Sequence, residues 1–257
     1  MPDLSQEPFP ETSSTASTGS RLITRLLKPA VRLWLNSQIE HAQHLDVTLT
    51  GSDRQILGGY LPGAHVVAQD VVYRGLRLSS IDVAAQGIRT NGLRVLRGDA
   101  FQLLEPLPID VHVMLSEADL HQSLAAPLFA NAIEELLQRI VAHCMDWSDR
   151  RHADDGQDVH LSDLSITLRS NRLQLSGPLI TGDRLVQLSL NTGLRLHTPN
   201  TLMFETPQFM LDGEPIEGRS LDKLNQFSID LGETTTINAM QIENDCLSCQ
   251  GQIVVMP

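Results

Sequence analysis

The chain has 257 residues, a formal net charge of −12 at pH 7 and a pI of about 5.1. Proteins that bind nucleic-acid phosphates need a basic footprint, so this acidic balance argues against a nucleic-acid partner. Aromatic residues make up only 4% of the sequence while hydrophobic residues make up 41%, which predicts an interior packed with leucine, valine and isoleucine.

The first twenty residues predict a disordered tail. Residues 1–20 are rich in serine, threonine and proline, and they contain no lysine, no arginine and no apolar run. Such a segment has too little apolar surface to become ordered, and it lacks both the basic and the hydrophobic parts of a signal peptide. We therefore expect a cytoplasmic protein in which residues 21–257 form a single domain.

The segment 21–42 has the pattern of an amphipathic helix, which Pro29 is expected to kink or to split. The segment contains four lysine or arginine residues and one acidic residue, Glu40, so its net charge is +3. The rest of the chain therefore carries −15. A basic amphipathic helix suits the surface of an anionic membrane, and the alternative is an ordinary packed helix with a solvated face. The cations are spaced so that they share one stripe of the helix: Arg21, Arg25, Lys28 and Arg32.

Alternating apolar residues predict two sets of β-strands, one over residues 45–113 and one from residue 161 to the C-terminus. Tight hairpin turns are expected at residues 170–172 and 191–193, where short polar sequences separate apolar pairs. No alternation of strands with helices that would indicate a parallel sheet is present, so both sets are expected to be antiparallel.

A second helical region is predicted between the two sets of strands, over residues 117–147. Ser116 is expected to cap it with Asp119 as the capping-box partner, and Pro127 is expected to interrupt it. Two helical segments and two sets of antiparallel strands indicate an α+β fold.

The sequence contains no pattern that predicts catalysis. Nucleophile elbows, phosphate-binding loops, dinucleotide-binding glycines and zinc-protease motifs are all missing. The pair Cys246 and Cys249 has the spacing of a metal or redox motif, but strand alternation places the two side chains on opposite faces. We therefore predict no catalytic residue, no metal site and no cofactor.

Five segments have a distinctive wording: RLLKPAVRLWLNSQIE (25–40), SDRQILGGYLPG (52–63), DVVYRGLRLSSIDV (70–83), LLEPLPI (103–109) and LSEADLHQSLAAPLFANAI (115–133). Together they resemble the LmeA-like phospholipid-binding family, and the match is most similar to its cyanobacterial branch. This resemblance extends over residues 21–257 and implies phospholipid binding. It also implies a fold similar to tubular lipid-binding (TULIP-like) proteins, in which a curved antiparallel sheet wraps long helices. Envelope members of the family carry an N-terminal hydrophobic segment that is not found here.

The sequence thus favours a non-enzymatic phospholipid-binding or lipid-transfer protein that attaches peripherally to the cytoplasmic face of an anionic membrane through its basic helix. The alternative is a membrane-linked scaffold or assembly factor whose apolar groove binds a protein helix. A lipid hydrolase is the least favoured of the three. The acyl chains are expected in an aliphatic cleft lined by Val71, Tyr73, Leu76, Leu78, Leu120, Leu124 and Leu128.

Overall fold

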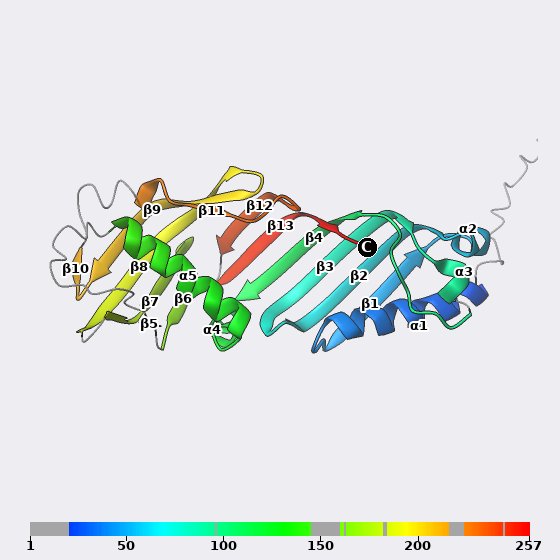
Figure 1. The fold of residues 1–257 in the computed structure, drawn as a ribbon, viewed down its shortest axis with the longest axis horizontal. Coiled ribbons are helices and arrows are strands. Elements are labelled where there is room, and N and C mark those ends of the chain that lie inside the picture. The colour runs from blue at the N-terminus through cyan, green and yellow to red at the C-terminus, as the bar shows by residue number, and fades with distance from the viewer. Residues whose placement is uncertain are drawn as a thin grey trace, which may run out of the picture.

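The computed structural model describes residues 21–95, 97–144, 160–161, 163–181, 184–215, 224–243 and 245–257. The predicted disordered tail, residues 1–20, lies outside the described residues. The molecule is elongated, and two antiparallel sheets lie next to each other along its long axis (Figure 1).

The first sheet has six strands in the order β1-β2-β3-β4-β13-β12. Its two longest strands, β2 and β3, form a hairpin around Arg74 and Gly75. The hairpin of β12 and β13 comes from the C-terminal end of the chain and pairs with β4, which completes the sheet. The strands are β1 (His44–Thr50), β2 (Tyr60–Tyr73), β3 (Leu76–Arg89), β4 (Leu107–Ser116), β12 (Thr235–Glu243) and β13 (Cys246–Val255).

The second sheet forms from strands that follow one another closely in the chain. Its path is β10-β9-β8-β7-β5, with β6 paired to β7 and β11 paired to β9. Because these strands pair mostly with their sequence neighbours, they form a separate sheet. The strands are β5 (His160–Leu161), β6 (Ser165–Arg169), β7 (Arg172–Thr181), β8 (Arg184–Thr198), β9 (Thr201–Leu211), β10 (Glu214–Pro215) and β11 (Ser228–Asp230).

Of the two predicted hairpin turns in the second sheet, one is confirmed and one is wrong. Ser170 and Asn171 join β6 to β7 with positive φ angles of 51° and 62°, as a tight hairpin turn requires. Residues 191–193 form no turn, because β8 runs through them with a β-bulge between Asn191 and Gly193. A bulge and a turn use the same small and polar residues, which explains the error.

The helices contain far fewer of the residues than the strands do. Ser116 caps α4 and Asp119 completes the capping box, as predicted. Pro127 is the first residue of α5, a position where its missing N–H group is tolerated, whereas Pro29 lies within the continuous α1. The helices are α1 (Arg21–Gln38), α2 (Asp53–Leu57), α3 (Gly92–Val95), α4 (Glu117–Ser123) and α5 (Pro127–Cys144).

Helix α4 joins the two sheets. The Glu117 carboxylate accepts a hydrogen bond from the Leu168 backbone N–H of β6 at 2.8 Å. At the other side, the Arg77 backbone N–H of β3 donates to the Ser123 hydroxyl at 2.9 Å. One cluster of buried side chains includes residues of both sheets, α4 and α5, so the junction is packed as well as hydrogen-bonded.

The expectation of a curved sheet wrapped around long helices, as in tubular lipid-binding proteins, is wrong. The structure consists mainly of two open antiparallel sheets, and α1 lies against one side of the first sheet instead of inside it (Figure 1). Leu33 of α1 is 72% exposed, which an enclosed helix would not allow. The chain cannot close one sheet around the helices because β6 to β9 pair among themselves.

Candidate functional site

The first sheet has one apolar face and one polar face. In register across β3, β4, β13 and β12 lie three rows of mostly aliphatic residues. The residues that alternate with these rows point to the other face and are mostly polar. There, the His65 ring lies 2.7 Å from the Asp82 carboxylate, and the Gln252 amide donates to the Asp110 carboxylate at 3.2 Å. The three rows, named here the apolar face, are Ile81-Val113-Cys249-Met240, Val83-Val111-Gly251-Ile237 and Ala85-Ile109-Ile253-Thr235.

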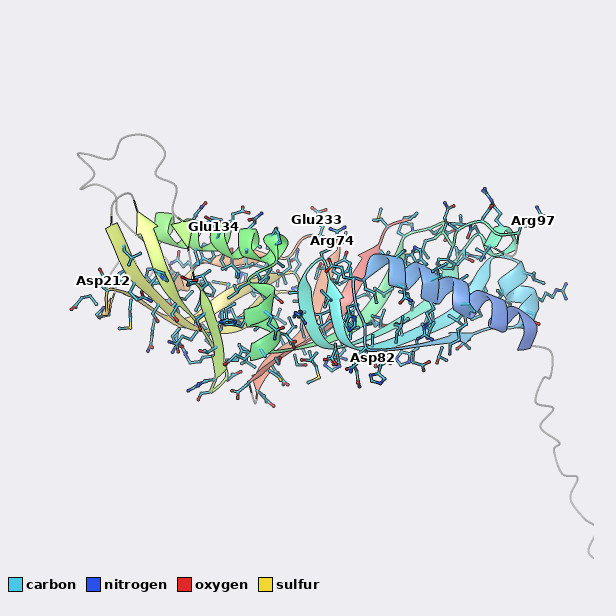
Figure 2. All side chains as sticks on the ribbon, turned by 90° about the horizontal axis from the view of Figure 1, so that it is seen from below. Arg74, Asp82, Arg97, Glu134, Asp212 and Glu233 are labelled. Carbon is cyan, nitrogen blue, oxygen red and sulfur yellow. The ribbon has the colours of Figure 1, made fainter. Side chains whose placement is uncertain are left out.

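Two segments cover one end of this sheet on its apolar side. In α1, Val31, Trp34 and Leu35 pack into a second core cluster with residues of β1 and β2. The segment 97–106 between α3 and β4, named here the strap, adds Phe101 and Leu103 to that cluster. The Trp34 and Phe101 rings lie 5.5 Å apart between centroids, so the helix and the strap contact each other. Figure 2 shows α1 on one side of the sheet and Asp82 on the other.

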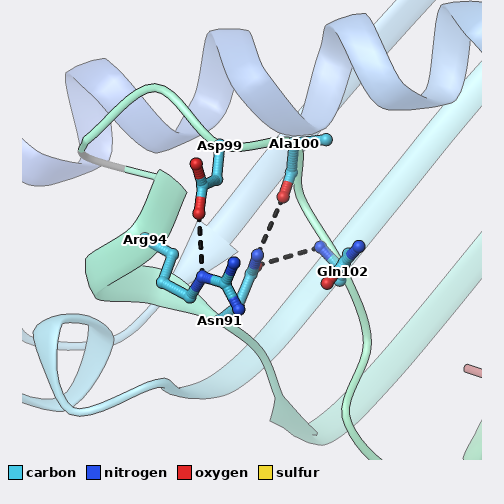
Figure 3. A network of polar contacts seen from close by, with 5 residues as sticks. All are labelled: Asn91, Arg94, Asp99, Ala100 and Gln102. Atoms are coloured by element: carbon cyan, nitrogen blue, oxygen red, sulfur yellow. Dashed lines mark hydrogen bonds and ion pairs between the residues drawn. The ribbon is translucent and has the colours of Figure 1, made fainter.

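Buried Asn91 holds the strap in place (Figure 3). Its side-chain amide donates to the Ala100 carbonyl at 2.8 Å, and its side-chain oxygen accepts from the Gln102 N–H at 3.0 Å. At the surface, Arg94 and Asp99 form an ion pair at 2.8 Å. The strap therefore has a defined conformation over the end of the sheet.

The middle of the apolar face is not covered to the same extent. Val83, Val111 and Ile237 are only half-buried, and Ile253 is 39% exposed. Within the part of the chain that the structure describes, these four residues belong to neither core cluster. Single exposed apolar residues are ordinary, but neighbouring rows on four strands form a continuous patch of the kind that marks a binding surface.

A separate cleft of about 380 Å³ lies where α4, α5 and the start of β6 meet. This volume is within the range of small-molecule sites. Half of its lining is polar or charged, so it is less suited to acyl chains than the apolar face. The lining residues are His121, Leu124, Ala125, Ala130, Glu134, Asp163, Leu164 and Ser165.

The predicted lipid-binding residues lie at the junction of the two sheets. Val71, Leu78 and Leu120 are buried in the shared core cluster. Leu76 and Leu124 pack against that cluster, and Leu124 also lines the cleft. Of the other two, Tyr73 is exposed, with the Arg74 guanidinium 5.5 Å from its ring centroid, and the Leu128 side chain lies outside the described residues.

Sequence reasoning missed the apolar face because two of its four strands come from the C-terminal end of the chain. The signal in β4 was visible, since Ile109, Val111 and Val113 alternate with polar residues. Nothing local to β4 indicates that β13 is its partner, and only that pairing extends the rows.

The structure describes part of the predicted cation stripe on α1. Arg21 and Arg25 lie in the helix, but their side chains are outside the described residues. The Lys28 ammonium is 3.4 Å from the Asp46 carboxylate in a solvent-exposed pair, and Arg32 is exposed. Next to Arg32, the exposed Leu33 adds an apolar side chain to the outer surface of the helix.

Cys246 and Cys249 lie on opposite faces of β13, as predicted. Cys246 pairs with Ser116 and Cys249 pairs with Val113, so that only Cys249 lies on the apolar face. Burial raises the pKa of the Cys249 thiol, which lowers its reactivity. Among the described residues, no group of three or more His, Cys, Asp or Glu could hold a metal ion, and no helix is long and apolar enough to cross a membrane.

The sequence matches the family model described as LmeA-like phospholipid-binding over residues 18–252, which is nearly the whole chain. The chain belongs to this family. The match includes α1, all of both sheets except the last three residues of β13, and every residue of the apolar face except Ile253. No curated protein and no solved structure is significantly similar to the chain.

Proposed function

We propose that this LmeA-like protein is a non-enzymatic phospholipid carrier whose apolar face holds acyl chains. The observation that carries the proposal is the set of in-register aliphatic rows on β3, β4, β13 and β12 that neither α1 nor the strap fully covers. Each methylene group that an acyl chain removes from water contributes about 0.8 kcal/mol. A long chain along these rows would therefore be retained strongly even with weak headgroup contacts.

The composition of the face favours an acyl chain over a protein helix. Its three rows contain valine, isoleucine, alanine, methionine, cysteine, one glycine and one threonine, and they contain no aromatic and no charged residue. Protein partners are usually anchored through aromatic residues and arginine, and these are missing here. Capture of a helix, the scaffold alternative, becomes one outcome of the test below.

The same proposal includes peripheral attachment to an anionic membrane through α1. Lys28 and Arg32 are accessible to solvent, and Arg21 and Arg25 precede them in α1. Each cation near an anionic surface contributes about 1 kcal/mol, which is screened by salt and hence reversible. Reversible attachment is what a carrier needs if it takes lipid from one membrane and gives it to another. We place this activity on a cytoplasmic membrane face.

Neighbouring residues on β4 provide a matched test. Val111 lies in the central row of the apolar face, and His112 lies on the polar face, where its ring is 3.0 Å from the Ser248 hydroxyl. Protein mixed with phospholipid vesicles and re-isolated by gel filtration should retain phospholipid detectable by mass spectrometry. Val111→Asn should reduce the retained lipid several-fold, and His112→Asn should leave it unchanged.

Melting curves of both variants identify any loss of folding. Equal lipid retention by wild-type and Val111→Asn protein, with both folded, would remove the apolar face from the site. Wild-type protein that retains no lipid, or that retains a polypeptide instead, would contradict the carrier function, and a retained polypeptide would favour the scaffold.

A further inference from the structure

Positive charge is concentrated in three segments of this acidic chain. Residues 21–38, 53–57 and 89–105 contain eight of the 19 lysines and arginines but only three of the 31 acidic residues. Eight cations and three carboxylates give these segments a net +5, which leaves −17 on the rest of the chain. Helix α2 contacts both α1 and α3, and Figure 1 shows the start of α1 beside α2 and α3 at one end of the molecule.

The arginines that this end adds to those of α1 are accessible. Arg54 of α2, Arg89 at the end of β3 and Arg97 of the strap are all exposed. Figure 2 shows Arg97 at the end of the molecule farthest from the second sheet. The Arg89 guanidinium lies 4.9 Å from the Tyr60 ring centroid, and Arg94 pairs with Asp99. Among the described residues, Arg54 and Arg97 form no ion pair, so their charges are available to a partner.

One large apolar side chain is exposed beside Arg89, and another follows the last strand of the first sheet. Leu104 of the strap is 57% exposed, and its backbone N–H donates to the Arg89 carbonyl at 3.0 Å. Met256 is 63% exposed and follows Val255, which pairs with Leu107 at the start of β4. Exposed apolar residues among arginines are the composition of a surface that inserts shallowly into a membrane interface.

Close packing and hydrogen bonds hold the backbone of this end. A side chain at position 92 would collide with the Ile56 carbonyl oxygen, so Gly92 allows α3 to pack directly on α2. The hydrogen bonds of Asn91 fix the strap that carries Leu104. The backbone that carries Leu104 and these arginines is therefore already ordered before binding, which lowers the entropy lost on binding.

From these observations we propose that the end formed by α2, α3 and the strap is a second membrane-contact surface, specific for anionic phospholipid bilayers, with Arg54, Arg89, Arg97 and Leu104 as its contact residues. The proposal rests on the proposed lipid-binding function and deepens it. The row Ala85-Ile109-Ile253 of the apolar face is the one nearest to Leu107 and Val255, so the apolar face continues to this end. Docking by this end brings the acyl-chain site next to the bilayer.

The test measures vesicle binding and lipid loading separately. Sedimentation with equimolar phosphatidylglycerol and phosphatidylcholine vesicles gives the partition coefficient, and retention of a fluorescent short-chain phospholipid added without vesicles gives the loading. Arg54→Gln with Arg97→Gln should weaken partition about fivefold for each arginine, hence about 25-fold for both, at low salt. Leu104→Ser should weaken it by about tenfold. Neither variant should change loading.

The second sheet offers matched controls, because β8 carries an exposed arginine and an exposed leucine. Arg195→Gln and Leu185→Ser should leave vesicle partition unchanged. Partition that is unaffected in both Leu104→Ser and the double arginine variant would overturn the second contact. Wild-type protein that binds vesicles of phosphatidylcholine alone as strongly as the mixed vesicles would also overturn the second contact. Wild-type protein that partitions as expected but loads no phospholipid would instead contradict the proposed function and leave the contact in place.

Discussion

Removing the Asn91 side chain should release the strap from the end of the sheet. Asn91→Ala deletes two hydrogen bonds, from its amide to the Ala100 carbonyl at 2.8 Å and from the Gln102 N–H to its side-chain oxygen at 3.0 Å. Each contributes about 1 kcal/mol net. Because Asn91 itself is buried, we expect the free energy of unfolding to fall by about 2 kcal/mol.

The matched control is the ion pair between Arg94 of α3 and Asp99 of the strap. Arg94 and Asp99 are exposed, so Asp99→Asn should lower the free energy of unfolding by less than about 1 kcal/mol. Urea denaturation followed by circular dichroism measures both variants. A loss for Asp99→Asn that equals or exceeds the loss for Asn91→Ala would refute the assignment of Asn91 as the residue that holds the strap.

Two further predictions concern the junction of the sheets and the central row of the apolar face. Burial raises the pKa of Asp119, but hydrogen bonds from Ser79 and Ser116 and the charge of Arg77 outweigh it, so its pKa lies below the usual value. A lowered folded-state pKa gives stability that is present above the unfolded-state pKa and lost as the pH falls through the folded-state pKa. Thermal melts of Asp119→Asn should therefore depend less on pH below about 4 than those of wild-type protein, and identical slopes would contradict this. Gly251→Ala should lower the free energy of unfolding by about 1 to 3 kcal/mol, because its Cβ would collide with the Thr236 carbonyl oxygen at the bulge of β12; an unchanged urea midpoint would be inconsistent with this packing.

The local parts of the fold were predictable from the sequence. The cap at Ser116, the break at Pro127 and the turn at Ser170 and Asn171 each depend on a few neighbouring residues, and the structure contains all three. The strand alternation that separates Cys246 from Cys249 is likewise local. Such features are encoded within one turn or one strand.

The parts that failed depend on pairing between distant segments. Residue 111 of β4 faces residue 251 of β13, and no pattern near either residue specifies the other. This pairing places β13 and β12 beside β4 and so extends the apolar rows to β12. The prediction of Val71 and Leu120 as lipid-binding residues rested on apolar periodicity, which core residues share with ligand-lining residues. Both lie in the shared core cluster, and their contact with lipid stays a prediction.

The central claim, that acyl chains lie on the apolar face, is tested most directly by the two native thiols of β13. In Cys144→Ser protein, Cys249 reports on the apolar face and Cys246 on the opposite face. Mass spectrometry should show that bound phospholipid slows maleimide labelling of Cys249 and leaves the labelling of Cys246 unchanged. Labelling of Cys249 at the same rate in lipid-loaded and lipid-free protein would contradict the account.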